Sequence, residues 1–133
     1  RIEAALRAAE QQTSAEIRVA VSRWYFWGDV RRAAERAFRR LGMTATQRRN
    51  GVLVFLSLRR RRFELLGDVA VDEKLTDADW QIVAAILRSH FTRGDLSGGI
   101  EAAVARLSSD LARHFPPAPH DRNELPDAVA TDV

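Results

Sequence analysis

Residues 50–68 decide the fold: they read Asn-Gly-Val-Leu-Val-Phe-Leu-Ser-Leu, then four arginines, then Phe-Glu-Leu-Leu-Gly-Asp. The apolar, partly β-branched run at 52–58 is short, which is typical of a strand buried on both faces. The four arginines at 59–62 must reach solvent, so the chain turns there. Residues 63–66 then return as a second strand, and the pair is predicted to form an antiparallel hairpin.

A parallel partner is predicted before this hairpin. Residues 17–21 place an isoleucine and two valines at alternate positions, as in a half-buried strand. Residues 30–41 carry apolar side chains at helical spacing, with Asp29 as the N-cap and Gly42 as the stop. Strand, helix and strand in this order form a right-handed βαβ unit with parallel strands.

The predicted fold class is α/β, a three-layer α/β/α sandwich with about four helices. Its small mixed sheet joins the parallel βαβ unit to the antiparallel hairpin. Further helices are expected over residues 1–12, from residue 76 to about 91, and from about 96 to 111. Residues 69–75 are predicted to form a short extra strand or a turn. The domain spans residues 1–115, and residues 116–133 are predicted to be a disordered, proline-containing tail.

Composition limits the function classes. The chain has 133 residues, of which 46% are hydrophobic, which suits one domain with a substantial core. No apolar stretch approaches the ~20 residues of a membrane span and no secretory signal is visible, so the expected location is cytoplasmic, with an upstream signal or anchor left open. The absence of cysteine excludes disulfides and thiolate metal sites. Lys74 is the only lysine among 21 basic residues, and interspersed acidic residues favour a solvated surface over nucleic-acid binding.

Chain direction predicts that polar residues meet at one edge of the sheet. Glu16 begins the first strand and Asn50 precedes the second, while the hairpin returns Asp68 to the same edge. Hard cations such as Ca²⁺ and Mg²⁺ need several oxygen ligands, and clustered carboxylates repel one another unless a cation or a raised pKa relieves them. The predicted divalent-cation site consists of Glu16, Asn50, Asp68, Asp72 and Glu73. Asp68 is also the best candidate for a catalytic residue.

Each of these residues also has a purely structural explanation. Glu16 fits a solvated strand end, Asn50 a turn residue at positive φ, and Asp68 a turn former. Asp72 and Glu73 then become ordinary surface charges. Both interpretations stay open at this point.

A run of four aromatic residues suggests a second kind of function. Side chains alternate faces along an extended chain, so four large neighbours cannot all enter one core. Exposed aromatics indicate a protein partner, a membrane interface or a homodimer surface. The alternative is a small cluster that covers the helix ends. The predicted partner surface comprises Trp24, Tyr25, Phe26 and Trp27.

Several short motifs together resemble a known family. They are Glu10, Thr13-Ser14-Ala15-Glu16-Ile17-Arg18-Val19, Ala37-Phe38, Thr46, Asn50-Gly51-Val52-Leu53-Val54 and Gly67-Asp68. This set is similar to the TPM domain, which is named for a thylakoid lumen protein, a photosystem II-associated protein and a worm acetylcholine-receptor modulator. The resemblance runs from about Ile2 to Pro116. It is strongest to short bacterial members, which lack the transmembrane segment and glycine-rich tail of longer ones.

The resemblance implies several functions. The plant member is described as an acid phosphatase, the animal member as a receptor modulator, and a small bacterial member as a binder of divalent cations such as calcium. Several longer members carry an acidic residue just before Asn-Gly, where this chain has Arg49, a charge that disfavours tight metal binding and favours a phosphate. The predicted function is therefore a TPM-type domain that binds Ca²⁺ or Mg²⁺, with metal-assisted phosphatase activity implied by the resemblance. The alternative is a non-enzymatic interaction module that uses residues 24–27.

Overall fold

The computed structural model describes residues 1–23, 28–117 and 129–131, which form a mixed four-stranded sheet in the order β3-β2-β1-β4. The strands are β1 (Glu16–Ser22), β2 (Gly51–Ser57), β3 (Arg62–Gly67) and β4 (Ala130–Thr131). β1 and β2 are parallel, with Glu16 opposite Gly51. β2 and β3 are antiparallel, with Val52 opposite Gly67. Both pairings confirm the prediction from chain direction.

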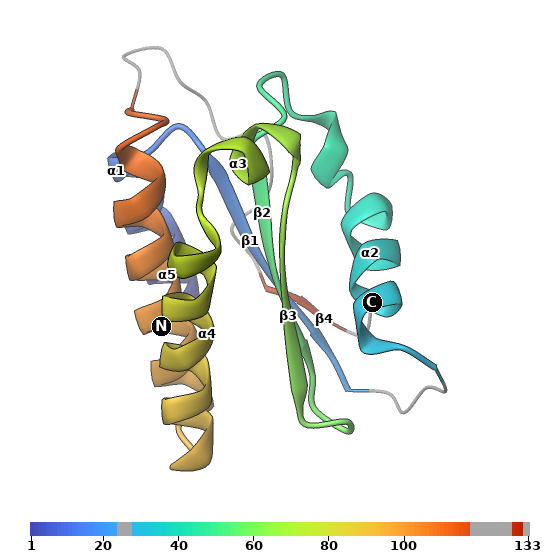
Figure 1. The fold of residues 1–133 in the computed structure, drawn as a ribbon. Helices are drawn as coiled ribbons and strands as arrows, with labels where there is room; N and C mark the ends of the chain where they lie inside the picture. Colours follow the sequence, from blue (N-terminus) through green and yellow to red (C-terminus); the bar gives the residue numbers. More distant parts are fainter. Residues whose placement is uncertain (24–27, 118–128, 132–133) are drawn as a thin grey trace.

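Helices cover both faces of the sheet (Figure 1). One layer contains α1 (Ile2–Gln12), α4 (Asp77–Thr92) and α5 (Leu96–Ala112), and the other contains α2 (Val30–Arg40). Every residue of β2 is buried, because alternate side chains enter two separate cores. Val52, Val54 and Leu56 belong to the larger core, and Leu53 and Phe55 belong to the core under α2. This arrangement confirms the three-layer α/β sandwich.

Two elements differ from the sequence-based expectation. Residues 69–75 were expected as a strand or turn, but Val69–Lys74 form the helix α3, because Asp68 caps it through a bond from the Val69 amide. A fifth α-helix is thereby added to the expected set. The short strand β4 pairs in parallel with β1, with Ala20 opposite Ala130. Ala130 and Thr131 belong to the tail predicted to be disordered, while residues 118–128 and 132–133 lie outside the described part of the chain, so the disorder of the tail stays a prediction.

Within the described residues, every helix is too short or too polar to span the hydrocarbon core of a bilayer.

Candidate functional site

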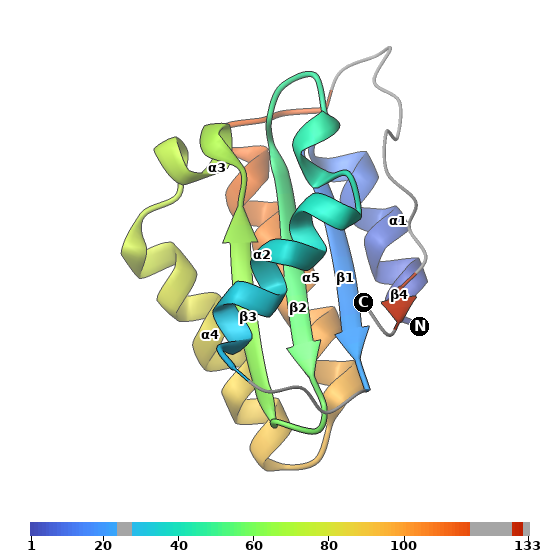
Figure 2. The same cartoon turned by 90° about the vertical axis from the view of Figure 1, so that its right-hand side faces the viewer.

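Polar residues come together at one end of the sheet, where β1 and β2 begin and β3 ends (Figure 2, top). The amide of Glu16 donates to the carbonyl of Asn50 at 3.3 Å, and the amide of Asp68 donates to the carbonyl of Gly51 at 2.8 Å. The side-by-side placement predicted for Glu16, Asn50 and Asp68 is thus observed. With Arg49 and Asp72, described below, these three residues are called the polar rim.

Three of the rim residues are buried to an unusual degree for polar groups. Glu16 is 6% exposed, Asn50 1% and Asp68 4%. The interpretation of Glu16 as a solvated strand end is therefore wrong. Burial of polar groups costs free energy unless partners are supplied, so the chain must hold these groups for a structural or a functional reason.

Asn50 is held through two hydrogen bonds. Its side-chain amide nitrogen donates to the Ser14 carbonyl at 3.4 Å, and its backbone amide donates to the Thr46 hydroxyl at 3.3 Å. The side-chain oxygen is the only acceptor of this amide, so it is the atom that could bind a cation. The positive φ expected for Asn50 belongs instead to Arg49, at 50°.

Arg49 forms an ion pair with Asp68. Its Nε donates to Oδ2 at 2.6 Å and its Nη2 donates to Oδ1 at 2.8 Å, while Oδ1 also accepts from the Val69 amide at 2.8 Å. A carboxylate offers about four acceptor sites, so these three bonds leave roughly one on Oδ2. Arg49 is the principal site residue that sequence reasoning did not assign, although its place before Asn-Gly was noted.

The backbone of Arg49 is also constrained. Its left-handed conformation is uncommon for a residue with a side chain, and its carbonyl accepts the Ala70 amide at 3.1 Å. The hydrogen bond to Asp68, together with the Asp68 charge, raises the pKa of Arg49. The Arg49 side chain nevertheless remains 46% exposed, so its outer surface is available to a ligand.

The two remaining candidates lie on α3. Asp72 is in the first turn, where its amide donates to the Asp68 carbonyl at 3.0 Å. Partial burial raises the pKa of the Asp72 carboxyl and the Asp68 carboxylate raises it further, while Arg31 lowers it. Glu73 is exposed on the same helix. Asp72 is exposed as well, and what links it to the polar rim is the effect of the Asp68 charge on its carboxyl.

Two glycines explain why the strand ends and their flanking turns pack so closely. A Cβ at Gly51 would lie 3.0 Å from the Met43 carbonyl oxygen. A Cβ at Gly67 would lie 2.8 Å from a methyl group of Val71. Real Cβ atoms are rarely so close to other atoms, so the Asn-Gly and Gly-Asp steps allow the turns to fold against the sheet. The sequence signal for this was the pair of glycines at the two strand ends.

The oxygen ligands that the polar rim offers suit a hard cation only in part. Carboxylate and amide oxygens suit Ca²⁺ or Mg²⁺. Across residues 1–23, 28–117 and 129–131, however, no three or more His, Asp or Glu side chains form a group that could hold a metal ion. A cation at this place would have to share Asp68 with Arg49 or displace the guanidinium.

The predicted partner surface at residues 24–27 lies outside the described residues. It stays a prediction.

Comparison with known proteins places the chain in a family. Residues 1–110 match the family model of the TPM domain, so the chain belongs to the TPM domain family. The NMR structure of the BA42 protein from the psychrophilic bacterium Bizionia argentinensis is similar, with a TM-score of 0.91 and 29% identity over 98% of this chain and 89% of that chain. The N-terminal domain of a P. gingivalis protein shares the fold, with a TM-score of 0.68 and 20% identity over 88% of this chain and 76% of that chain. No curated protein matches the sequence.

Proposed function

We propose that this TPM domain binds a divalent cation, Ca²⁺ or Mg²⁺, at the polar rim. The observation that carries the proposal is the burial of Glu16, Asn50 and Asp68, three oxygen-bearing side chains from three separate segments, at one edge of the sheet. Asp72 adds a fourth oxygen ligand, on α3, close enough to Asp68 for the two charges to interact.

Arg49 takes the role of the compensating charge when no cation is bound. Its guanidinium occupies two of the Asp68 acceptor sites and leaves roughly one free. A cation must compete with this pair, so binding is expected to be weak, with a dissociation constant of about 10⁻⁴–10⁻³ M. The observed Arg49 geometry thus predicts a low-affinity site.

A phosphomonoester is a second candidate ligand for the same place. Arg49 donates to Asp68 through Nε and Nη2. Its Nη1 group has no hydrogen-bond partner among the described residues, and the side chain is about half exposed. Guanidinium N–H groups suit phosphate oxygens. In this arrangement Arg49 orients the phosphate, and Asp68 sets the position of Arg49. When bound, a cation would supply charge neutralisation for phosphoester hydrolysis.

The test is an amide-resolved NMR titration of the folded protein with Ca²⁺ and then Mg²⁺. Saturable shifts at Glu16, Gly51 and Asp68–Asp72 are expected, and they should disappear in Asp68→Asn. The matched control is Asp77→Asn, which neutralises an exposed carboxylate in the first turn of α4. It should leave the titration unchanged.

Two results would contradict the cation proposal. One is a flat titration up to millimolar cation, and the other is an equal loss of response in Asp68→Asn and Asp77→Asn, which would indicate diffuse charge screening. Methyl phosphate, titrated with and without Ca²⁺, tests the second candidate. Binding that persists in Arg49→Gln would exclude the role given to that guanidinium.

A further inference from the structure

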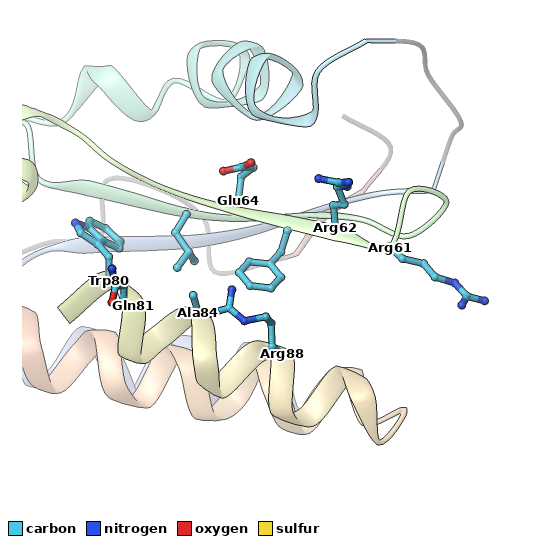
Figure 3. Close-up of a pocket in the computed structure, with 9 residues that line it drawn as sticks. Arg61, Arg62, Glu64, Trp80, Gln81, Ala84 and Arg88 are labelled. Carbon is cyan, nitrogen blue, oxygen red and sulfur yellow. The ribbon is translucent and has the colours of Figure 1, made fainter. Parts of the chain in front are cut away.

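A groove of about 620 Å³ runs between β3 and α4, along the outer side of β3 (Figure 3). Trp80, Gln81, Ala84 and Arg88 line it from α4. The hairpin side is lined by Arg61, Arg62, Phe63, Glu64 and Leu65. None of the polar-rim residues belongs to this lining. The groove is therefore a separate candidate site.

β3 is an edge strand, paired only with β2 in the described sheet. The bond from the Asp68 amide to the Gly51 carbonyl sets the phase of this antiparallel ladder. Alternate residues of an edge strand point their backbone groups outward, and here these are Phe63, Leu65 and Gly67. One outward group, the Leu65 carbonyl, accepts a hydrogen bond from Arg31 at 3.0 Å. A side chain thus substitutes for a missing strand at a single position.

Four apolar side chains contribute to the lining of the groove. Phe63 and Leu65 lie on the strand side, and Trp80 and Ala84 on the helix side. Ala84 is small, so it leaves room between the helix and the strand edge. In strand addition, an extended peptide pairs with an exposed edge strand, and pockets beside the edge receive its alternate side chains.

The charges along the groove favour a negatively charged ligand. Three arginines line it, at positions 61, 62 and 88. Within the described part of the chain, none of the three forms an ion pair, and Glu64 is engaged by Arg31 at 3.2 Å. The Arg88 guanidinium lies 6.0 Å from the centre of the Phe63 ring. The lining is therefore positive at the hairpin end and apolar near Trp80.

The arginines also lie on both sides of the strand edge. Arg62 points away from α4, whereas Arg88 lies between α4 and β3 (Figure 3). Consecutive side chains of an added strand point to opposite faces of the sheet. Two neighbouring acidic residues would therefore meet Arg62 and Arg88 respectively.

We propose that the β3–α4 groove docks an extended acidic polypeptide segment as an additional strand on β3. Backbone groups of the segment pair with Phe63 and Leu65, and Arg31 releases the Leu65 carbonyl. Adjacent acidic side chains contact Arg62 and Arg88, and an apolar side chain packs against Trp80. This function is independent of cation binding at the polar rim.

The test begins with selection of peptides from a random phage-displayed library on the intact protein. The selected sequences should be enriched in adjacent Asp or Glu residues followed by an apolar residue. Synthetic copies of them should shift the Phe63 and Leu65 amides and the Trp80 indole, and should slow hydrogen exchange at the Leu65 amide. The double variant Arg62→Gln with Arg88→Gln should weaken binding roughly tenfold or more, because charge-assisted contacts are lost. Arg36→Gln, an exposed arginine of α2, serves as the matched control and should have no effect.

Three outcomes would overturn the proposal. The first is selection that yields no acidic enrichment, and the second is binding whose shifts map away from β3 and α4. The third is a concentration-dependent dimer, seen by sedimentation, that protects the Leu65 amide without any peptide. That result would assign the groove to a second copy of this chain.

Discussion

The guanidinium of Arg49 donates two hydrogen bonds, of 2.6 and 2.8 Å, to the carboxylate of Asp68, which lies 19 positions later in the sequence. Arg49 precedes β2 and Asp68 follows β3, so the pair closes the open end of the hairpin. The same carboxylate caps α3. The Asp68 side chain therefore links the end of β3 to Arg49, which has a left-handed backbone before β2, and to the first turn of α3.

Replacement of Arg49 by Gln is expected to strengthen Ca²⁺ binding. The change removes the positive charge that competes for Asp68, and nearby like charge disfavours a bound cation, so a gain of roughly tenfold is expected. Isothermal titration calorimetry at low salt measures it, with Arg39→Gln on the last turn of α2 as the control. Weaker binding in Arg49→Gln would mean that the guanidinium orders the site instead of competing with the ligand.

Cation binding should weaken as the pH falls, and the loss should begin above the ordinary carboxyl pKa of 3.8. The pKa of Asp72 is raised in the folded protein by partial burial and by Asp68, so its proton competes with a cation at a higher pH. The same shift means that ionised Asp72 costs folding free energy at neutral pH, a cost that disappears once the carboxyl is protonated. Ca²⁺ titrations between about pH 3 and 7 test this, since this range includes the ordinary carboxyl pKa and the values above it. Asp72→Asn should flatten the profile, and an unchanged profile would remove Asp72 from the site.

Gly67→Ala should destabilise the fold by about 1–3 kcal/mol, because the added methyl group would overlap Val71 and crowd Trp80. Urea unfolding followed by Trp fluorescence gives the free energy of unfolding. A double-mutant cycle isolates the cause: in a Val71→Ala background the cost of Gly67→Ala should fall. An unchanged cost in that background would point to the backbone instead of the side-chain contact.

Thr76→Ala should lower the free energy of unfolding by about 1 kcal/mol, since Thr76 is the N-cap of α4 in a complete capping box. The reciprocal bond from the Thr76 amide lowers the pKa of Asp79. The stabilisation from Asp79 is therefore present above its unfolded pKa and is lost as the pH falls through its lowered folded pKa. Thermal unfolding at pH 7 and at low pH checks both points. Thr44→Ala, at an exposed position in the short 3₁₀ helix η1 (Met43–Ala45), is the control.

Arg61→Gly should raise stability by about 0.5–1 kcal/mol, because Arg61 holds a left-handed φ of 52° in the hairpin turn and glycine adopts this conformation without a Cβ penalty. Chemical unfolding measures the gain. Arg60→Gly, at the preceding turn position, lacks the positive φ and should give no such increase. A loss of stability in Arg61→Gly would mean that the arginine side chain contributes more than its backbone costs.

The sheet and the meeting of Glu16, Asn50 and Asp68 were predictable, because both follow from chain direction and from a buried run too short for a helix. The pairing of Arg49 with Asp68 was not, since it depends on a left-handed φ at one residue that no sequence pattern requires. Helix α3 was missed because its six residues are too few to show a period. Strand β4 was missed for a similar reason, as two residues pair with a strand more than a hundred positions earlier.

The two edge strands of the sheet, β3 and β4, differ in length. The chain's own C-terminal strand β4 lies against β1, while the β3 border has no strand beside it in the described residues. β4 pairs with two of the seven residues of β1, and it is then the outer strand at that side. Exposed edge strands are common starting points for aggregation, and very short edge strands disfavour it. A further strand therefore finds a longer edge at β3 than at β4.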